Sequence, residues 1–253
     1  MASNKDLFEY LLRLGDNTLI IGHRLSEWCG HGPQLEEDIA LINVSLDLIG
    51  RSRSWLTYAG EVEGAGRTED DLAFKRDDVF FRNNLLCEQP NGDFASTILR
   101  QLFFDVYTYY QYTELVKSKD TTISAIAVKS LKEIEYHVRH SRDWTLRLGD
   151  GTEESNKRMQ SAINNLWRFV GDLFDMDAVD ENLMVEGIAC DNNKIKTLWE
   201  KTIFEILAEA NLKTPEKAFF AKGSRVGMHT EHLGFLLAEM QYLPRAYPTA
   251  SWS

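Results

Sequence analysis

Hydrophobic residues recur along much of the chain in steps of three and four, the spacing that places side chains on one face of an α-helix. The first such line runs from Leu7 to Trp28 and predicts a long helix, which ends where Gly30 to Pro33 interrupts the pattern. A second long helix follows, and we expect one line of its side chains to point inward: Leu35, Ile39, Ile42, Leu46, Ile49 and Leu56.

A second apolar set lies on the same predicted helix and widens its hydrophobic arc to more than half the circumference: Leu41, Val44, Leu48, Trp55, Ala59 and Val62. A helix with so wide an apolar surface is typically buried on more than one side. We therefore expect it in the middle of a bundle or beside a partner.

The remainder of the chain predicts more helices with short connections. After an irregular region over residues 63–92, helices are expected at about 94–117, 123–148, 153–174, 178–186, 193–212 and from 231 to a stop at Pro244. No strand-like alternation and no helical-repeat period recurs, which disfavours a solenoid. The pattern predicts an all-α, ferritin-like bundle of long helices with extra short ones, forming a single domain over residues 1–253.

Composition narrows the function classes. The 253 residues carry 28 Lys and Arg against 39 Asp and Glu, a net charge of −11, which disfavours binding to nucleic acid or to an anionic membrane surface. No signal peptide and no membrane-spanning apolar segment is apparent. Cys29, Cys87 and Cys190 are far apart and are expected to be buried free thiols, so the sequence predicts a cytoplasmic protein.

A bundle of this kind can hold two iron ions when two of its helices each carry Glu-x-x-His, because that spacing places both ligands on one face. The chain has six histidines, so the motif is easily tested. The residues three positions before them are Ile20, Trp28, Ile134, His137, Val226 and His229. None is acidic, so the motif does not occur.

Several polar residues still invite a chemical role. His137 lies on a predicted inward line where a ligand would be expected, but a core histidine bonded to a carboxylate or a carbonyl fits the same position. Glu133, four residues earlier, could bond to His137 but is turned off that line, and Asp105 sits among apolar neighbours. Asp47 and Arg51 are four apart and form either an ordinary surface ion pair or a buried pair standing where metal ligands would be. The sequence leaves open whether Asp47, Arg51, Asp105 and His137 converge.

The run His229-Thr230-Glu231-His232 has a spacing suggestive of metal binding. Its position at the start of the last predicted helix favours another role, because Thr230 and Glu231 suit the capping of a helix N-terminus.

Blocks throughout the chain resemble the C subunits of bacterial phenylacetyl-CoA epoxidases. They are residues 14–17 (LGDN), 26–31 (SEWCGH), 46–50 (LDLIG), 88–92 (EQPNG), 135–137 (EYH), 165–169 (NLWRF), 229–234 (HTEHLG) and 238–243 (AEMQYL). This resemblance implies a ferritin-like, cytoplasmic, structural subunit that pairs tightly with a related catalytic A subunit. The A subunit carries the di-iron centre and binds the CoA thioester.

The same resemblance implies a further subunit and a reductase with FAD, an iron–sulfur cluster and NADPH, which together convert phenylacetyl-CoA to its ring epoxide with O2. In the catalytic relatives, Glu-x-x-His falls near residues 48–51 and 134–137. Here those places hold Leu48, Arg51, Ile134 and His137. We therefore expect a degenerate metal site around these residues and Asp47, with no metal or cofactor in this chain.

Two other hypotheses remain at this point. One is an independently active metal-dependent oxygenase that uses His137, Glu133 and Asp105. The other is a helical adaptor unrelated to oxygenases. When isolated, the chain is also a candidate for pairing with a second copy of itself.

Overall fold

The computed structural model describes residues 3–217 and 219–250, and these residues form α-helices and short 3-10 helices without a strand. The α-helices are α1 Asn4–Ser26, α2 Leu35–Glu63, α3 Glu69–Phe74, α4 Phe94–Leu115, α5 Thr121–Gly149, α6 Glu153–Leu166, α7 Ala178–Val185, α8 Asn192–Glu209 and α9 Glu231–Ala246. The 3-10 helices are η1 Asp78–Phe80, η2 Trp167–Phe174 and η3 Ser224–Val226. The all-α prediction is confirmed.

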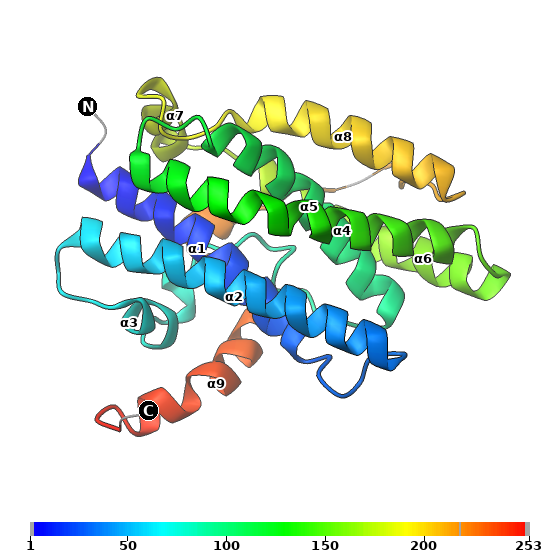
Figure 1. Cartoon of the computed structure of the whole chain (residues 1–253), viewed down its shortest axis with the longest axis horizontal. Helices are drawn as coiled ribbons and strands as arrows, with labels where there is room; N and C mark the ends of the chain where they lie inside the picture. The colour runs from blue at the N-terminus through cyan, green and yellow to red at the C-terminus, as the bar shows by residue number, and fades with distance from the viewer. Residues whose placement is uncertain (1–2, 218, 251–253) are drawn as a thin grey trace.

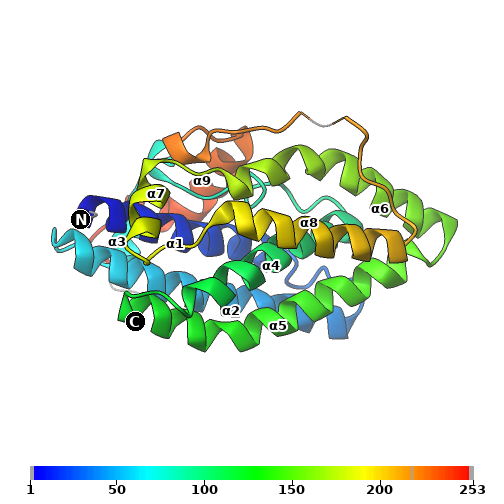
Figure 2. The same cartoon turned by 90° about the horizontal axis from the view of Figure 1, so that it is seen from above.

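Two antiparallel pairs of long helices build the bundle, α1 with α2 and α4 with α5, and α2 packs along α5 to join the pairs (Figure 1). The helices α6 and α8 lie against α4 and α5 (Figure 2). Close approach of α1 and α2 depends on glycine, because a Cβ at Gly15 would come within 2.6 Å of the Leu56 side chain. A Cβ at Gly22 would lie 3.2 Å from Leu48 Cβ.

Side-chain caps fix where the helices begin. Asp93 accepts a hydrogen bond from the backbone of Ser96 at 2.9 Å and starts α4, and Asp120 accepts from Thr122 and Ile123 and starts α5. At its other end α2 stops at Gly64, which adopts a left-handed conformation with φ of 69°.

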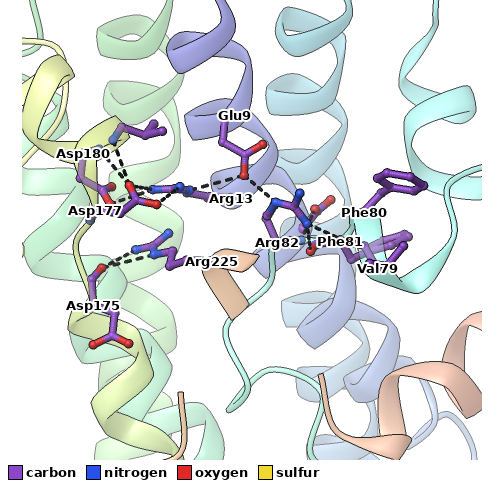
Figure 3. A network of polar contacts seen from close by, with 12 residues as sticks. Glu9, Arg13, Val79, Phe80, Phe81, Arg82, Asp175, Asp177, Asp180 and Arg225 are labelled. Carbon is purple, nitrogen blue, oxygen red and sulfur yellow. Dashed lines mark hydrogen bonds and ion pairs between the residues drawn. The ribbon is translucent and has the colours of Figure 1, made fainter. Parts of the chain in front are cut away.

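A buried arginine fastens α7 to α1 (Figure 3). Arg13 on α1 donates to Asp180 at 2.7 Å and to Asp177 at 2.6 Å, and both carboxylates belong to the N-terminal end of α7. Glu9, one turn earlier on α1, accepts from Arg82 at 2.5 Å. Two distant parts of the chain are thus tied to the first helix.

Cys87 and Cys190 are buried free thiols as expected, but Cys29 is exposed, because it lies in the turn after α1.

Several predicted boundaries were wrong. The region 63–92 contains α3 and η1, and the helix expected over 153–174 changes to 3-10 geometry at Trp167. The last helix continues past Pro244 to Ala246, because Arg245 anchors its final turn by donating to Arg76 O and to Asp77, each at 2.8 Å.

The predicted inward line of α2 was wrong for three of its six side chains, whereas Leu56 is buried as predicted and Ile42 and Ile49 are partly buried. Within this chain Leu35, Ile39 and Leu46 are 70%, 50% and 60% exposed. The other apolar set, from Leu41 to Ala59, faces the core and is almost completely buried, since α1 and α5 cover that side. The wide apolar arc of α2 thus leaves one hydrophobic face uncovered.

Among the described residues, no helix has the length and hydropathy needed to cross a bilayer.

Candidate functional site

The four positions singled out by the Glu-x-x-His comparison all lie inside the bundle. Leu48 and Arg51 on α2 and Ile134 and His137 on α5 are at most 3% exposed. Because α2 and α5 pack together, these side chains share one interior region, and two of them are polar.

His137 is bound by a carboxylate from the neighbouring helix. Its Nε2 lies 3.0 Å from Oδ2 of Asp47, which is partly exposed at the bundle surface. Burial lowers the pKa of His137, and the positive charge of Arg51 lowers it too, although the bond to Asp47 opposes the shift. A neutral imidazole donating from Nε2 to Asp47 fits this environment.

Arg51 places a buried positive charge beside His137. Its guanidinium lies 3.6 Å from Glu133 of α5 and 5.3 Å from the ring centroid of Tyr112 on α4. The Tyr112 hydroxyl in turn accepts from Trp55 Nε1 at 2.7 Å. Nε and Nη2 of Arg51 make no hydrogen bond within the described chain, so ion pairing and the aromatic face carry most of its stabilisation.

Asp105 of α4 is buried and held by neutral donors. Gln101 Nε2 donates to its Oδ1 at 2.6 Å, and Ser141 Oγ donates to its Oδ2 at 2.9 Å. Ser141 Oγ also lies 2.9 Å from the carbonyl of His137. Burial raises the pKa of Asp105 to about 7, because these donors and more distant cations only partly offset the loss of water.

The structure brings together the four polar residues whose relative positions the sequence left open. Asp47 and His137 bond directly, Ser141 links Asp105 to the His137 backbone, and Arg51 lies close enough to lower the pKa of both His137 and Asp105. Asp47 and Arg51 do not pair with each other. Arg51 points into the core towards Glu133, whereas Asp47 lies at the bundle edge within reach of α5.

Sequence reasoning missed several partners in this cluster. A second bridge joins the same two helices, with His140 Nε2 2.9 Å from Glu37 Oε2. Ser141 lies one turn after His137, and Gln101 lies one turn before Asp105. These spacings could have indicated polar neighbours within each helix, but the sequence does not say which other helix these side chains contact.

The donor set does not fit a di-iron centre. Leu48 and Ile134 have no donor atoms, and the Arg51 cation would repel a metal ion at the place where a histidine would bind it. The alternative ligand set does not form a common metal site either. His137, Glu133 and Asp105 each contact a different partner: Asp47, Arg51 and Gln101. In residues 3–217 and 219–250 no cluster of three or more His, Cys, Asp or Glu side chains could hold a metal ion.

The sequence suggested metal binding or helix capping for the run that begins at His229. In the structure, His229 and Thr230 instead bond to a buried carboxylate. Glu88 is fully buried, and it accepts from His229 Nδ1 at 2.9 Å and from the Thr230 amide and hydroxyl at 2.6 and 2.8 Å. His229 Nε2 lies 3.0 Å from the Phe81 carbonyl.

Burial lowers the pKa of His229, but Glu88 and the Phe81 carbonyl outweigh it and raise the pKa overall. Both ring nitrogens lie against acceptor oxygens, so this environment favours the imidazolium form of His229 and leaves neither nitrogen free to bind a metal ion. Thr230 occupies the N-cap position of α9, yet its hydroxyl bonds Glu88 and does not cap the helix. This group of bonds joins α9 to the region before α4.

The fold and this interior define an all-α bundle of long helices that holds a hydrogen-bonded polar cluster between α2, α4 and α5. The family described as "Phenylacetic acid catabolic protein" matches residues 1–252, and the chain belongs to that family. It is 50% identical over 246 residues to the C subunit of the 1,2-phenylacetyl-CoA epoxidase of Escherichia coli (strain K12), covering 97% of this chain and 99% of the relative. The resemblance seen in the sequence is confirmed.

Proposed function

We propose that this chain is the non-catalytic structural subunit of a phenylacetyl-CoA epoxidase complex, acting in phenylacetate degradation. The observation that carries the proposal is the buried Arg51, which stands with Leu48 and Ile134 where a catalytic relative needs metal ligands. The similarity to a protein named as the C subunit of such an epoxidase supports it. In this proposal Asp47, Leu48, Arg51, Ile134 and His137 mark a former metal site.

The chemistry then belongs to other components of the complex. A related A subunit would hold the di-iron centre that epoxidises the aromatic ring of phenylacetyl-CoA. A reductase would supply electrons from NADPH through FAD and an iron–sulfur cluster. This chain supplies none of these groups, and its role is to hold the A subunit in its active fold.

The polar cluster gives the structural role a physical basis. Where a metal centre would bind several helices together, three sets of contacts do so here: Asp47 with His137, Arg51 with Glu133, and Asp105 with Ser141. Such contacts between buried charges and donors fix the register of helices that packing alone would hold less specifically.

The uncovered face of α2 is the surface that we assign to the A subunit. Leu35, Ile39 and Leu46 form an exposed apolar stripe, and a Cβ at Gly50 would meet nothing within 4 Å. Exposed stripes of this kind mark protein interfaces, and a glycine beside them lets a second helix approach closely. We expect an interface of at least about 1,600 Å², the usual size for a specific complex.

Co-expression with the A subunit tests the proposal. The variants Leu46→Asp and Gly50→Phe should leave the melting temperature of this chain nearly unchanged and abolish co-purification at micromolar concentration. A matched control is Phe204→Asp on α8, which is 47% exposed and lies outside the stripe; it should leave co-purification intact.

Each result has a distinct meaning. If the unmodified chain and the A subunit separate at micromolar concentration, the proposed function is wrong. If they stay together and both stripe variants also bind normally, only the assigned face is wrong. In the absence of the A subunit, the same stripe can pair two copies, and added A subunit should then displace that homodimer.

A further inference from the structure

Helix α9 lies outside the four long helices, beside α3 and η1 (Figure 1). Of its side chains only Leu233, Leu236, Leu237 and Gln241 are buried. Gln241 Nε2 donates to the carbonyls of Ala73 and Arg76 at 3.1 and 2.9 Å, which fixes the helix along one side. The remaining surface of α9 faces away from the bundle and is held rigidly in place.

Large apolar side chains occupy that outward surface. Phe235 and Tyr242 are 68% and 65% exposed, and Leu243 and Tyr247 are about half exposed at 49% and 57%. Three such side chains on one short helix and a fourth directly after it are more than scattered surface residues, and a ridge of this composition is typical of a binding surface.

A groove runs along each side of this ridge. Between α9 and η1 lies a groove of about 580 Å³, whose lining includes Asp77, Asp78, Tyr242 and Arg245. Between α9 and α3 lies one of about 500 Å³, whose lining includes Asp70, Asp71, Lys75, Glu239, Leu243 and Tyr247. The exposed aromatic and aliphatic side chains of α9 therefore form the walls of two clefts.

Both grooves carry more negative than positive charge. Their two cations are already paired, Lys75 with Asp71 at 2.6 Å and Arg245 with Asp77 at 2.8 Å. Three lining carboxylates are then left without a cationic partner within the described residues: Asp70, Asp78 and Glu239. A second copy of this chain, with its net charge of −11, would bring more negative charge to the surface.

We propose that the α9 ridge, with its two grooves, binds a Lys/Arg-rich segment of another protein that also carries apolar anchors. The apolar side chains would pack on Tyr242 and Leu243, while the cations would meet Asp70, Asp78 and Glu239. The inference rests on the proposed function only in that this partner is sought among the other components of the same complex. Its surface is separate from the α2 stripe.

Site-specific photo-crosslinking tests this surface. The photoreactive residue p-benzoylphenylalanine replaces Tyr242 in the full chain, within cells that co-express the components of the complex. Phe204, exposed on α8, takes the same residue as a control. The Tyr242 position should crosslink to a segment of a different protein that has a clear excess of Lys and Arg, and the Phe204 position should not.

Charge reversal then tests the electrostatic part. Asp70→Lys combined with Asp78→Lys should reduce the crosslink at least tenfold, whereas Glu153→Lys with Glu205→Lys, two exposed acids on α6 and α8, should not. The inference is overturned by a crosslink to a second copy or to an acidic segment, by no crosslink, or by a crosslink that survives charge reversal. Co-purification of the A subunit in the same sample reports separately on the proposed function.

Discussion

Asp105 is the residue of the polar cluster whose protonation changes closest to neutral pH. Its pKa is raised from 3.8 to about 7, so the folded chain keeps a proton that the unfolded chain has released. Stability therefore falls as pH rises from about 4 to 7 and stays reduced above that range. Raising the pKa from 3.8 to about 7 lowers the free energy of unfolding at pH 8 by on the order of 4 kcal/mol.

Replacing Asp105 by Asn should remove this cost. The amide has nearly the same shape and can still meet Gln101 and Ser141, but it cannot ionise. We expect Asp105→Asn to raise the melting temperature at pH 8 and to have a much smaller effect at pH 4. Asp143→Asn, on the exposed side of α5, serves as the control. A destabilised Asp105→Asn protein at pH 8 would contradict the assigned protonation.

His137 should give the opposite pH dependence. Its pKa is lowered from 6.5 by burial, so the unfolded chain takes up a proton at a higher pH than the folded chain does. Stability is then lost as pH falls through about 6.5. The variant His137→Gln keeps a donor for Asp47 and should lower the urea midpoint at pH 7 but show a shallower decline from pH 7 to 5.

The exposed His31 provides the comparison for that experiment, and His31→Gln should leave the slope as it is in the unmodified protein. An unchanged slope in His137→Gln would show that the buried imidazole does not titrate as described.

At the level of single residues, the sequence predicted interior positions on α5 but not which atoms meet there. Helical spacing correctly placed Ile134 and His137 on an inward line. It could not predict that Asp47 turns to His137 and Arg51 to Glu133, because these contacts depend on how α2 and α5 are rotated against each other. Tyr112, which covers the Arg51 guanidinium, comes from a third helix.

Among the elements, α7 depends on one buried arginine (Figure 3). Removing the Arg13 charge leaves Asp180 buried without a cation, a change that typically costs about 3–5 kcal/mol. Arg13→Met should therefore lower the free energy of unfolding by about that amount in urea titrations.

Arg158 provides a matched control, because its ion pair with Glu154 at 2.7 Å is exposed on both sides. Arg158→Met should change the free energy of unfolding much less than Arg13→Met does, because water already screens an exposed ion pair. Equal effects of the two substitutions would show that the Arg13 network contributes no more than a surface ion pair.

Helix α2 shows a limit of prediction from hydrophobic periodicity. Its two apolar lines together cover too much of the helix for the pattern alone to say which one meets the core. The choice depends on α1, whose Gly15 and Gly22 admit Leu56 and Leu48 at close range. Leu35, Ile39 and Leu46 are thereby left outside, although Leu56 of the same predicted line is buried. The change to 3-10 geometry after Leu166 likewise has no periodic signal, since its residues remain amphipathic.

Across the whole molecule, the order of the long helices and the family follow from the sequence, whereas the arrangement of α3, η1 and α9 does not. That arrangement depends on contacts between distant segments, such as Glu88 with His229 and Asp16 with Arg76. Among the exposed apolar residues, those of α2 and those beside α9 differ in character, because acidic side chains line only the grooves beside α9.

Metal analysis tests whether this chain supports a di-iron partner without holding iron itself. The chain is co-expressed with the A subunit in iron-supplemented cells, the complex is purified, and the separated subunits are assayed for iron. We expect iron in the A subunit and no stoichiometric iron in this chain, because Leu48, Arg51 and Ile134 offer no metal ligand at the positions proposed for the former site. Two iron ions bound per copy of this chain would contradict it.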